Sequence, residues 1–365
     1  MPEDNSGRQW AYDTRTSYQK WLETEGIPVI QGYFIEDLKT MEVHPWPRQD
    51  AKGVHINLEG CGGSVDSYAL EMAPGKATAP EKHMYEEIVY VLEGRGATTI
   101  WVDEQHKHTF EWGPGSLFSP PLNTWHQHFN GQGDKPARLW AVTSAPLVID
   151  LYHNSEFVFN SDFVFRDRYD HESDYFSGQG KSLPGRVWES NLIPDVPNFQ
   201  LTTWKERGAG GANAMFELSN NTMCAHVSQF PVGTYKKAHR HGPGAHVVLL
   251  RGIGYSLLWK AGDKDFIKVD WQEGSMFVPP DQYFHQHFNV GTEPARYLAI
   301  RWGSQKFRSA VDTDIERIDR GLGQGGSQIE YEEQDPRVQE LFERETAKQG
   351  AKSLMDEFFT ARAKG

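Results

Sequence analysis

The chain has 365 residues and a formal net charge of -13, with a pI near 5.6. Its length suffices for two domains that each bury a core, and its acidic balance without a basic run argues against nucleic acid as a partner. No apolar run approaches the roughly 18 to 20 residues that cross a bilayer, and the N-terminus lacks the features of a signal peptide, so we expect a cytoplasmic protein with no membrane partner. The two cysteines, Cys61 and Cys224, fit a reducing compartment.

The first half of the chain predicts an arm followed by a β domain. Residues 1–52 form an N-terminal arm, with a helix over 14–25 that ends at Gly26-Ile27-Pro28. Residues 53–149 contain short segments rich in Val, Ile, Tyr and Thr, separated by Gly, Pro and Asn turns. Strands without intervening helices indicate an antiparallel sandwich or barrel.

The second half repeats this organisation and adds a tail. Residues 150–205 form a connecting segment packed on the barrels, and residues 206–306 repeat the β pattern. Residues 307–365 form a tail in which 321–326 reads as flexible. Asp335-Pro336 then starts a helix that docks on its own barrel or on a neighbouring subunit. We therefore expect an all-β protein with a helical tail, assembled as a homo-oligomer.

An internal repeat fixes the number of domains at two. Trp125-His126-Gln127-His128-Phe129-Asn130 recurs as Phe284-His285-Gln286-His287-Phe288-Asn289. Upstream of both copies, Gly and Pro stand at matching places. Self-similarity of this length indicates two copies of one small fold.

The second copy carries three histidines that we expect to converge. Residues two apart on a strand point to the same side, so His239 and His241 both face the barrel interior, where a separate strand brings His285. Three neutral imidazoles leave a dication its charge of +2 and leave coordination positions open. We therefore predict a catalytic metal site that takes a small anionic chelating substrate and O₂.

The first copy differs in charge at the same places. It has Glu81, His83 and His126, and Glu87 stands where the second copy has Ala245. Two carboxylates would neutralise a dication and fill its coordination positions. We expect this site to be structural, weaker in catalysis, or occupied by a harder ion such as Mn(II); with Glu81 turned away, it would be a two-histidine, one-carboxylate set.

Four further side chains near the motifs have predicted roles. His128 and His287 stand two residues after a ligand, and we expect them to orient ligands by hydrogen bonding. Arg301 ends a late strand and either pairs with a substrate carboxylate or forms an ordinary salt bridge. His246 is predicted to face solvent or an interface, on the opposite side of its strand from the site.

These motifs resemble the cupin superfamily, whose patterns are G-x5-H-x-H-x3/4-E-x6-G and G-x5-P-x-G-x2-H-x3-N. The resemblance covers both copies, most of residues 53–301. This chain departs from the pattern at Glu81, at Ala245, and at Asn123 and Gln282, which replace a glycine. The resemblance implies two tandem jelly-roll barrels.

Within the superfamily, the stretch from His239 to Ala245 resembles gentisate and related 1,2-dioxygenases, although their three-histidine iron is usually in the first cupin. The resemblance implies a non-haem Fe(II) dioxygenase that cleaves a hydroxylated aromatic acid, with Fe(II) in the second cupin and Fe(II) or Mn(II) in the first. A Mn-dependent decarboxylase or oxidase of oxalate type, centred on the first site, is an alternative. A non-catalytic metal- or ligand-binding cupin is another.

Overall fold

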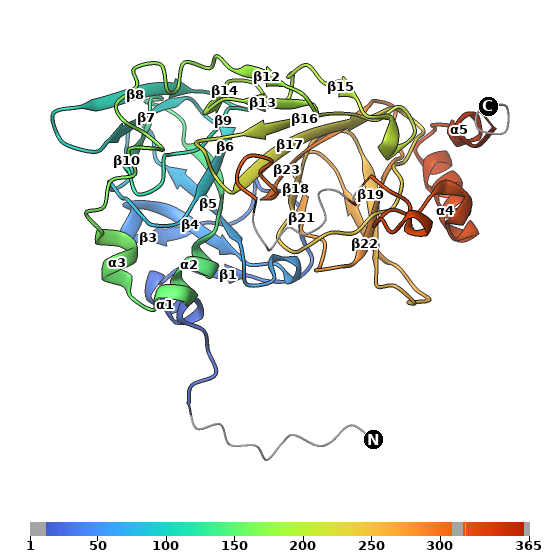
Figure 1. Ribbon diagram of the computed structural model, residues 1–365, viewed down its shortest axis with the longest axis horizontal. Coiled ribbons are helices and arrows are strands. Elements are labelled where there is room, and N and C mark those ends of the chain that lie inside the picture. The colour runs from blue at the N-terminus through green and yellow to red at the C-terminus, as the bar shows by residue number, and fades with distance from the viewer. Residues whose placement is uncertain (1–11, 309–316, 318, 361–365) are drawn as a thin grey trace.

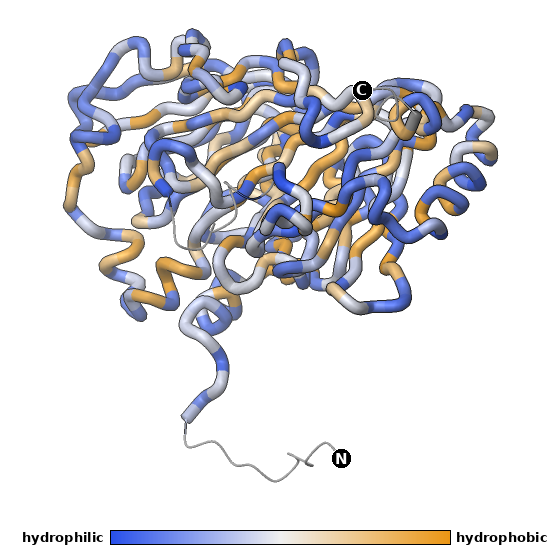
Figure 2. The backbone as a smooth tube through the Cα atoms, turned by 45° about the vertical axis from the view of Figure 1, so that its right-hand side comes forward, coloured by the Kyte–Doolittle hydropathy of each residue, from blue (hydrophilic) through white to orange (hydrophobic). Residues whose placement is uncertain are grey.

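Two β-barrels lie side by side and make up most of the molecule (Figure 1). The structure is a computed structural model that describes residues 12–308, 317 and 319–360. Each barrel consists of a large sheet facing a three-stranded sheet. Hydrophobic segments recur among the packed strands, and several outer loops are hydrophilic (Figure 2).

The first barrel is antiparallel around its central strands. Its large sheet has the core order β4 (Ala51–Ile56), β5 (Asp66–Met72), β11 (Ala137–Thr143), β6 (Glu87–Glu93) and β9 (Leu117–Phe118). Its small sheet has the order β10 (Trp125–Asn130), β7 (Gly96–Trp101) and β8 (Lys107–Trp112). The arm adds β3 (His44–Trp46) and, in parallel, β1 (Val29–Ile30), which both pair with β4.

The second barrel repeats this order strand for strand. Its large sheet contains β16 (Ala212–Glu217), β17 (Met223–Phe230), β23 (Ala295–Trp302), β18 (His246–Arg251) and β21 (Met276–Phe277). Its small sheet contains β20 (Ile267–Trp271), β19 (Gly254–Trp259) and β22 (Phe284–Asn289). The edge of the large sheet is extended by β12 (Lys181–Leu183), β13 (Val187–Glu189) and β15 (Thr202–Thr203). The predicted all-β fold with two tandem barrels is confirmed.

The segments before the two barrels exchange strands. From the arm, β2 (Phe34–Ile35) pairs with β21 of the second barrel. From the connecting segment, β14 (Leu192–Ile193) pairs with β9 of the first. Two equivalent arginines support this exchange: Arg138 donates to the carbonyls of 38, 39 and 41, and Arg296 to those of 196, 197 and 199.

The two barrels also share one hydrophobic core. A single cluster of buried side chains includes Val54 and Trp140 from the first barrel and Phe216 and Leu298 from the second. Because this cluster is continuous across both barrels, their separation would expose apolar surface to water at a large free-energy cost. The relative position of the two sites is therefore fixed by packing.

Helices cover the ends of the barrels. The predicted arm helix is α1 (Ser17–Glu25), which begins with a capping box at Thr16 and ends at left-handed Gly26. It packs near α2 (Ala145–Tyr152) and α3 (Ser155–Asn160) at the first barrel. No described helix has the length and apolar character needed to cross a membrane.

The tail docks on the second barrel of its own chain. Helix α4 (Pro336–Lys348) is capped by Asp335, as predicted, and its Val338 and Phe342 pack with Tyr235 and Phe288 of the barrel. Helix α5 (Met355–Thr360) follows. The expectation of a flexible 321–326 segment is wrong: Leu322–Gln324 is a 3-10 helix, and the chain just after it forms a β-bridge with His239 through Gln328.

Candidate metal centres

The same backbone frame presents both groups of predicted ligands. In the first barrel, Glu81 and His126 exchange two backbone hydrogen bonds, of 2.8 and 3.0 Å, and His239 and His285 exchange two in the second, of 2.8 and 3.1 Å. A turn then closes each site: the Asn123 N–H donates to the His83 carbonyl, and the Gln282 N–H to that of His241.

The residues at these two turns explain a departure from the motif. Asn123 and Gln282 have φ of 54° and 57°. This left-handed region favours glycine, the residue of the cupin pattern, and asparagine tolerates it better than most other residues. The turn geometry is therefore kept although the glycine is replaced.

In the second barrel the three predicted histidines converge. One ring nitrogen from each of His239, His241 and His285 lies within 4.8 Å of the others, and all three side chains are buried. The Nδ1 atoms of His241 and His285 contact the carbonyls of 242 and 283, at 2.8 and 3.2 Å. An imidazole that donates a hydrogen bond from Nδ1 has its free lone pair on Nε2, the atom that would bind a metal. Both rings are therefore oriented for coordination.

Burial keeps these imidazoles neutral. It is the main cause that lowers the pKa of His239 and His285 well below the ordinary value, and that of His241 to about 3. Nearby Arg207 and Arg301 act in the same direction. Neutral imidazole is the form that binds a metal, so this donor set fits a dication without any carboxylate.

A cavity opens beside His239 and His241. Its wall carries a surplus of cationic side chains over acidic ones. Arg186, Arg207 and Arg301 line it together with a single acidic residue, Asp319. The predicted substrate residue Arg301 is part of its wall.

A buried lysine lies behind this wall. Lys236 is 1% exposed, and its Nζ donates to the Tyr297 hydroxyl at 3.0 Å. Tyr297 itself lines the cavity. Burial lowers the pKa of Lys236, while Tyr297 counteracts this effect. In its protonated form, Lys236 adds to the positive potential around the cavity.

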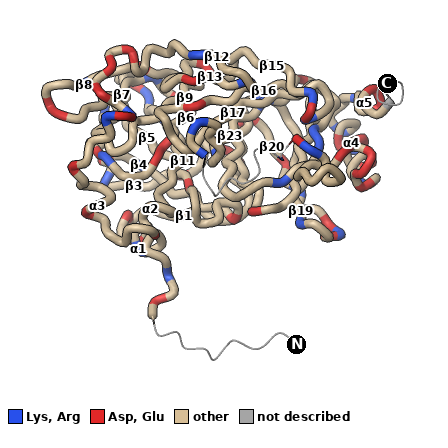
Figure 3. Tube along the Cα trace, viewed as in Figure 1, with Lys and Arg blue, Asp and Glu red and all other residues tan. Residues whose placement is uncertain are grey.

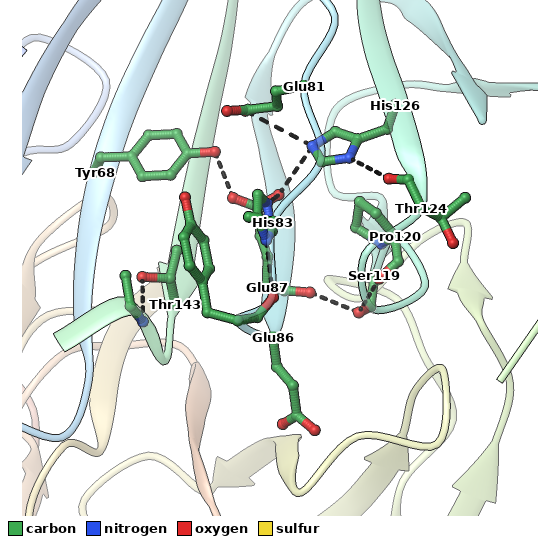
Figure 4. A network of polar contacts seen from close by, with 12 residues as sticks. Tyr68, Glu81, His83, Glu86, Glu87, Ser119, Pro120, Thr124, His126 and Thr143 are labelled. Carbon is green, nitrogen blue, oxygen red and sulfur yellow. Dashed lines mark hydrogen bonds and ion pairs between the residues drawn. The ribbon is translucent and has the colours of Figure 1, made fainter. Parts of the chain in front are cut away.

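The first barrel brings four ligand-type side chains together (Figure 4). The Glu87 Oε2 atom lies 3.7 Å from His83 Nε2 and 3.6 Å from His126 Nε2. The Glu81 Oε1 atom is 3.7 Å from His126 Nε2. The facing atoms of Glu87, His83 and His126 are buried and have no hydrogen-bond partner, which suits three donors around one cation.

Both carboxylates of this site are held by further side chains. Glu81 accepts hydrogen bonds from Arg48 at 2.5 Å and from Gln49 at 2.6 Å, and Glu87 accepts one from Tyr68 at 2.5 Å. Burial opposes ionisation, yet Arg48 lowers the pKa of Glu81 well below its ordinary value, and His83 lowers that of Glu87. Both groups are therefore anionic, and Glu81 does not turn away from the site.

The remaining predicted residues divide into two groups. His128 and His287 are buried, and their Nδ1 atoms lie 2.8 Å from the hydroxyls of Thr98 and Ser256, so each is fixed by a hydrogen bond behind the site. The placement of His246 on a solvent or interface face is wrong. Its ring is fully buried and contacts Cys61 Sγ at 3.5 Å across the barrels, because the shared core covers that face of β18.

Sequence reasoning missed the arm residues that complete each site. Arg48 and Gln49 belong to the 3-10 helix Pro47–Gln49, and Arg207 ends its counterpart, Lys205–Arg207. A tryptophan precedes each of these helices, Trp46 and Trp204. That shared tryptophan is the only sequence signal that we find for the correspondence.

Comparison with known proteins agrees with this architecture. A cupin domain model matches residues 69–143, which lie in the first barrel. The second barrel repeats the same strand order. The first barrel therefore matches a cupin domain, and the second barrel has the same strand order.

Other matches are more distant. A 5-aminosalicylate 1,2-dioxygenase from Comamonas sp is 29% identical over 80 residues, which make up 22% of this chain and 20% of that protein. The chain thus matches about a fifth of this relative's length. Among solved structures, a deletion mutant of Bacillus subtilis oxalate decarboxylase has a TM-score of 0.48 at 14% identity, covering 75% of this chain and 77% of that one. A single-substitution variant of the same enzyme has a TM-score of 0.49 at 15% identity, covering 75% and 78%.

Proposed function

We propose that the second barrel is the reaction centre of a non-haem Fe(II) dioxygenase acting on a small anionic substrate, such as a hydroxylated aromatic acid. One observation carries this proposal. The neutral imidazoles of His239, His241 and His285 converge, and the first two line a cavity whose wall carries more cationic than acidic side chains. A neutral donor set leaves the charge of a dication uncompensated, so an anionic chelator is the ligand that completes the site.

The side chains of the cavity have distinct tasks in this proposal. Arg301 binds the substrate carboxylate, since guanidinium presents paired donors that match a carboxylate. Arg207 in the wall and Lys236 behind it supply positive potential. A bound ferrous ion would supply the open coordination positions and the electrons that chemistry with O₂ requires.

Two small or neutral residues make room for the substrate. Ala245 stands where Glu87 fills the first site, next to Arg301 in the sheet register. His226 lines the cavity at the place of Tyr68, as their register with Ala299 and Ala141 shows. The residues that hold and fill the first site are thus replaced in the second, which supports the second barrel as the place where a substrate enters.

The similarity to a 5-aminosalicylate 1,2-dioxygenase supports the same substrate class. The name of that relative specifies a dioxygenase and a salicylate, which is a hydroxylated aromatic acid with adjacent oxygen donors. We propose that this chain acts on a related chelating acid, without specifying the ring substituents.

For the first barrel we propose a metal held mainly for structure, Mn(II) or Fe(II). A second candidate function is a Mn-dependent decarboxylase or oxidase of oxalate type centred there. The observation that favours it is the approach of both Glu81 and Glu87 to His126, because hard oxygen donors suit Mn(II). A metal-holding protein without turnover is the third reading.

One paired experiment separates these functions. Metal analysis of protein purified without added metal is combined with an O₂-uptake screen over hydroxybenzoates, diketones and oxalate. The proposal expects iron in the protein and O₂ consumption with a hydroxybenzoate. Manganese with CO₂ release from oxalate would favour the second candidate. Bound metal with no consumption of any compound would favour the third.

A further inference from the structure

A third group of ligand-type side chains lies outside both sites. We propose that Asp103, His106 and His171 form a site for zinc, or for another dication that prefers imidazole, which fastens the connecting segment to the first barrel. One donor atom from each residue lies within 4.8 Å of the other two. Zinc bonds of about 2.0 to 2.2 Å require the donors to approach somewhat closer, which small side-chain rotations achieve.

Asp103 is oriented for this role by its own turn. It lies between β7 and β8, where its Oδ1 atom accepts hydrogen bonds from the backbone N–H groups of 105 and 106, at 3.0 and 3.1 Å. The Nδ1 atom of His106 lies 2.8 Å from the same oxygen. This side-chain hydrogen bond lowers the pKa of Asp103, so the carboxylate is anionic at neutral pH.

His171 reaches the same carboxylate from a distant part of the chain. Its Nε2 atom lies 3.8 Å from Asp103 Oδ2, and its ring centroid is 4.8 Å from that of His106. Each carboxylate oxygen of Asp103 therefore faces one imidazole. Two imidazoles and one carboxylate suit zinc, and a partly exposed position leaves room for water as a fourth ligand.

The backbone at His171 gives an independent reason to expect a ligand. His171 has φ of 66°, which is uncommon for a residue other than glycine, and its Nδ1 atom is buried without a hydrogen-bond partner. Both features cost free energy, and such costs concentrate at functional sites. A metal bond to the opposite ring nitrogen would offset them.

A metal bound by Asp103, His106 and His171 would hold a segment that has little regular secondary structure. Between α3 and β12, residues 161–180 contain no helix or strand. Next to His171, Tyr169 packs into the core of the first barrel, and Arg168 contacts Glu86 and Asn221 on opposite barrels at 3.0 and 3.2 Å. A metal at His171 would therefore fix a segment that contacts both barrels.

Zinc titration of the full chain tests this site without using turnover. The barrel sites are first loaded, and Zn²⁺ is then titrated calorimetrically into the wild type, Asp103→Asn and His171→Ala. His44→Ala is the control, because His44 is a partly exposed histidine with a carboxylate 3.7 Å away but outside the cluster. Zinc-free melting temperatures establish that the variants fold.

We expect one additional equivalent of zinc in the wild type and the control, and its loss in both cluster variants. Zinc should also protect residues 161–180 from limited proteolysis in the wild type and in the His44→Ala control, but not in the two cluster variants. An equal zinc equivalent in His171→Ala, or none in the wild type, would overturn the proposal. Loss in His44→Ala as well would also overturn it, because binding would then be unspecific.

Discussion

The two barrels share a backbone frame but differ in how their interiors are filled. In the first, two carboxylates face the histidines, and Arg48 and Tyr68 hold those carboxylates. In the second, His239 and Ala245 take the places of the carboxylates, while Arg186, Arg207 and Arg301 line the adjacent cavity. Over the molecule as a whole, basic and acidic residues are interspersed (Figure 3). The carboxylates of the first site would thus neutralise the charge of a bound dication, whereas the second site has no carboxylate that would do so.

This difference shows how duplication can separate two tasks. The frame of paired strands and left-handed turns is preserved because it positions any ligand set. The charge of the ligand set changes through very few residues, since Glu81 and Glu87 carry the whole acidic contribution of the first site. Under the proposed function, a site that lacks them takes its anion from the substrate.

Removing one ligand from each barrel should have the largest and most unequal effects. We expect His241→Ala to reduce turnover with the identified substrate to background. That exceeds the roughly 10- to 100-fold loss typical of disturbing a residue behind the ligands, because the donor itself is gone. His83→Ala should instead act mainly on stability. Its melting temperature should fall, whereas its turnover number per folded molecule should change little.

Steady-state O₂ uptake and calorimetry on both variants measure this contrast. The metal content of each barrel is determined in parallel, so that loss of the ion is distinguished from loss of rate. An inactive His83→Ala together with an active His241→Ala would place the chemistry in the first barrel.

Restoring the missing carboxylate should make the second site behave more like the first. In Ala245→Glu the metal centre gains a negative ligand, falls in charge from +2 to +1 and loses an open position. Binding of an anionic substrate should weaken by roughly one to a few kcal/mol, as expected for a unit charge in a partly buried site. Metal should bind more tightly. Paired titrations with metal and substrate measure both, and equal substrate affinity in a folded variant would refute the charge argument.

A smaller effect is expected at Arg301. Replacing it with glutamine removes a hydrogen bond between charged groups, worth about 1.5 to 3 kcal/mol, so the dissociation constant of an anionic substrate should rise by about one to two orders of magnitude. Arg251→Gln is the matched control, at the end of β18. The comparison uses equilibrium binding to the metal-loaded protein. Equal affinities in the two variants would exclude Arg301 as the carboxylate ligand.

The last prediction concerns stability near the first barrel rather than ligand binding. Burial lowers the pKa of His55 from 6.5 to about 3. Only the unfolded chain takes up this proton between those values, so the contribution of His55 to stability is complete above pH 6.5 and declines as the pH falls toward 3. The slope is at most about 1.4 kcal/mol per pH unit.

The variant His55→Phe keeps the ring contacts with Trp21 and Trp46 and removes the titration. Its free energy of unfolding, measured by denaturant titration from pH 4 to pH 7, should depend less on pH than that of the wild type. Parallel dependences would mean that His55 is protonated in the folded protein.

The sequence was sufficient to predict the elements whose signal is local. The alternating β segments, the repeated histidine motif and the cap at Asp335 each predict structure from residues close in the chain, and these features are present. The convergence of His239, His241 and His285 also followed from strand geometry, since residues two apart share a face.

Features that depend on distant contacts were not predictable in this way. Nothing near Phe34 or Leu192 indicates that each strand joins the opposite barrel, because pairing partners lie far along the chain. His246 was misplaced for the same reason: its strand alternates as expected, but a second barrel covers the outer face. Arg48 reaches Glu81 only through the folded arm.

A crystal structure of the iron-loaded protein, prepared without O₂ and soaked with the hydroxybenzoate found in the screen, tests the central claim most directly. The account predicts that the substrate contacts the metal of His239, His241 and His285, with its carboxylate at Arg301. It predicts that the metal of the first barrel contacts Glu81, Glu87 and their histidines without substrate. Substrate bound in the first barrel, or a second barrel without metal, would contradict it.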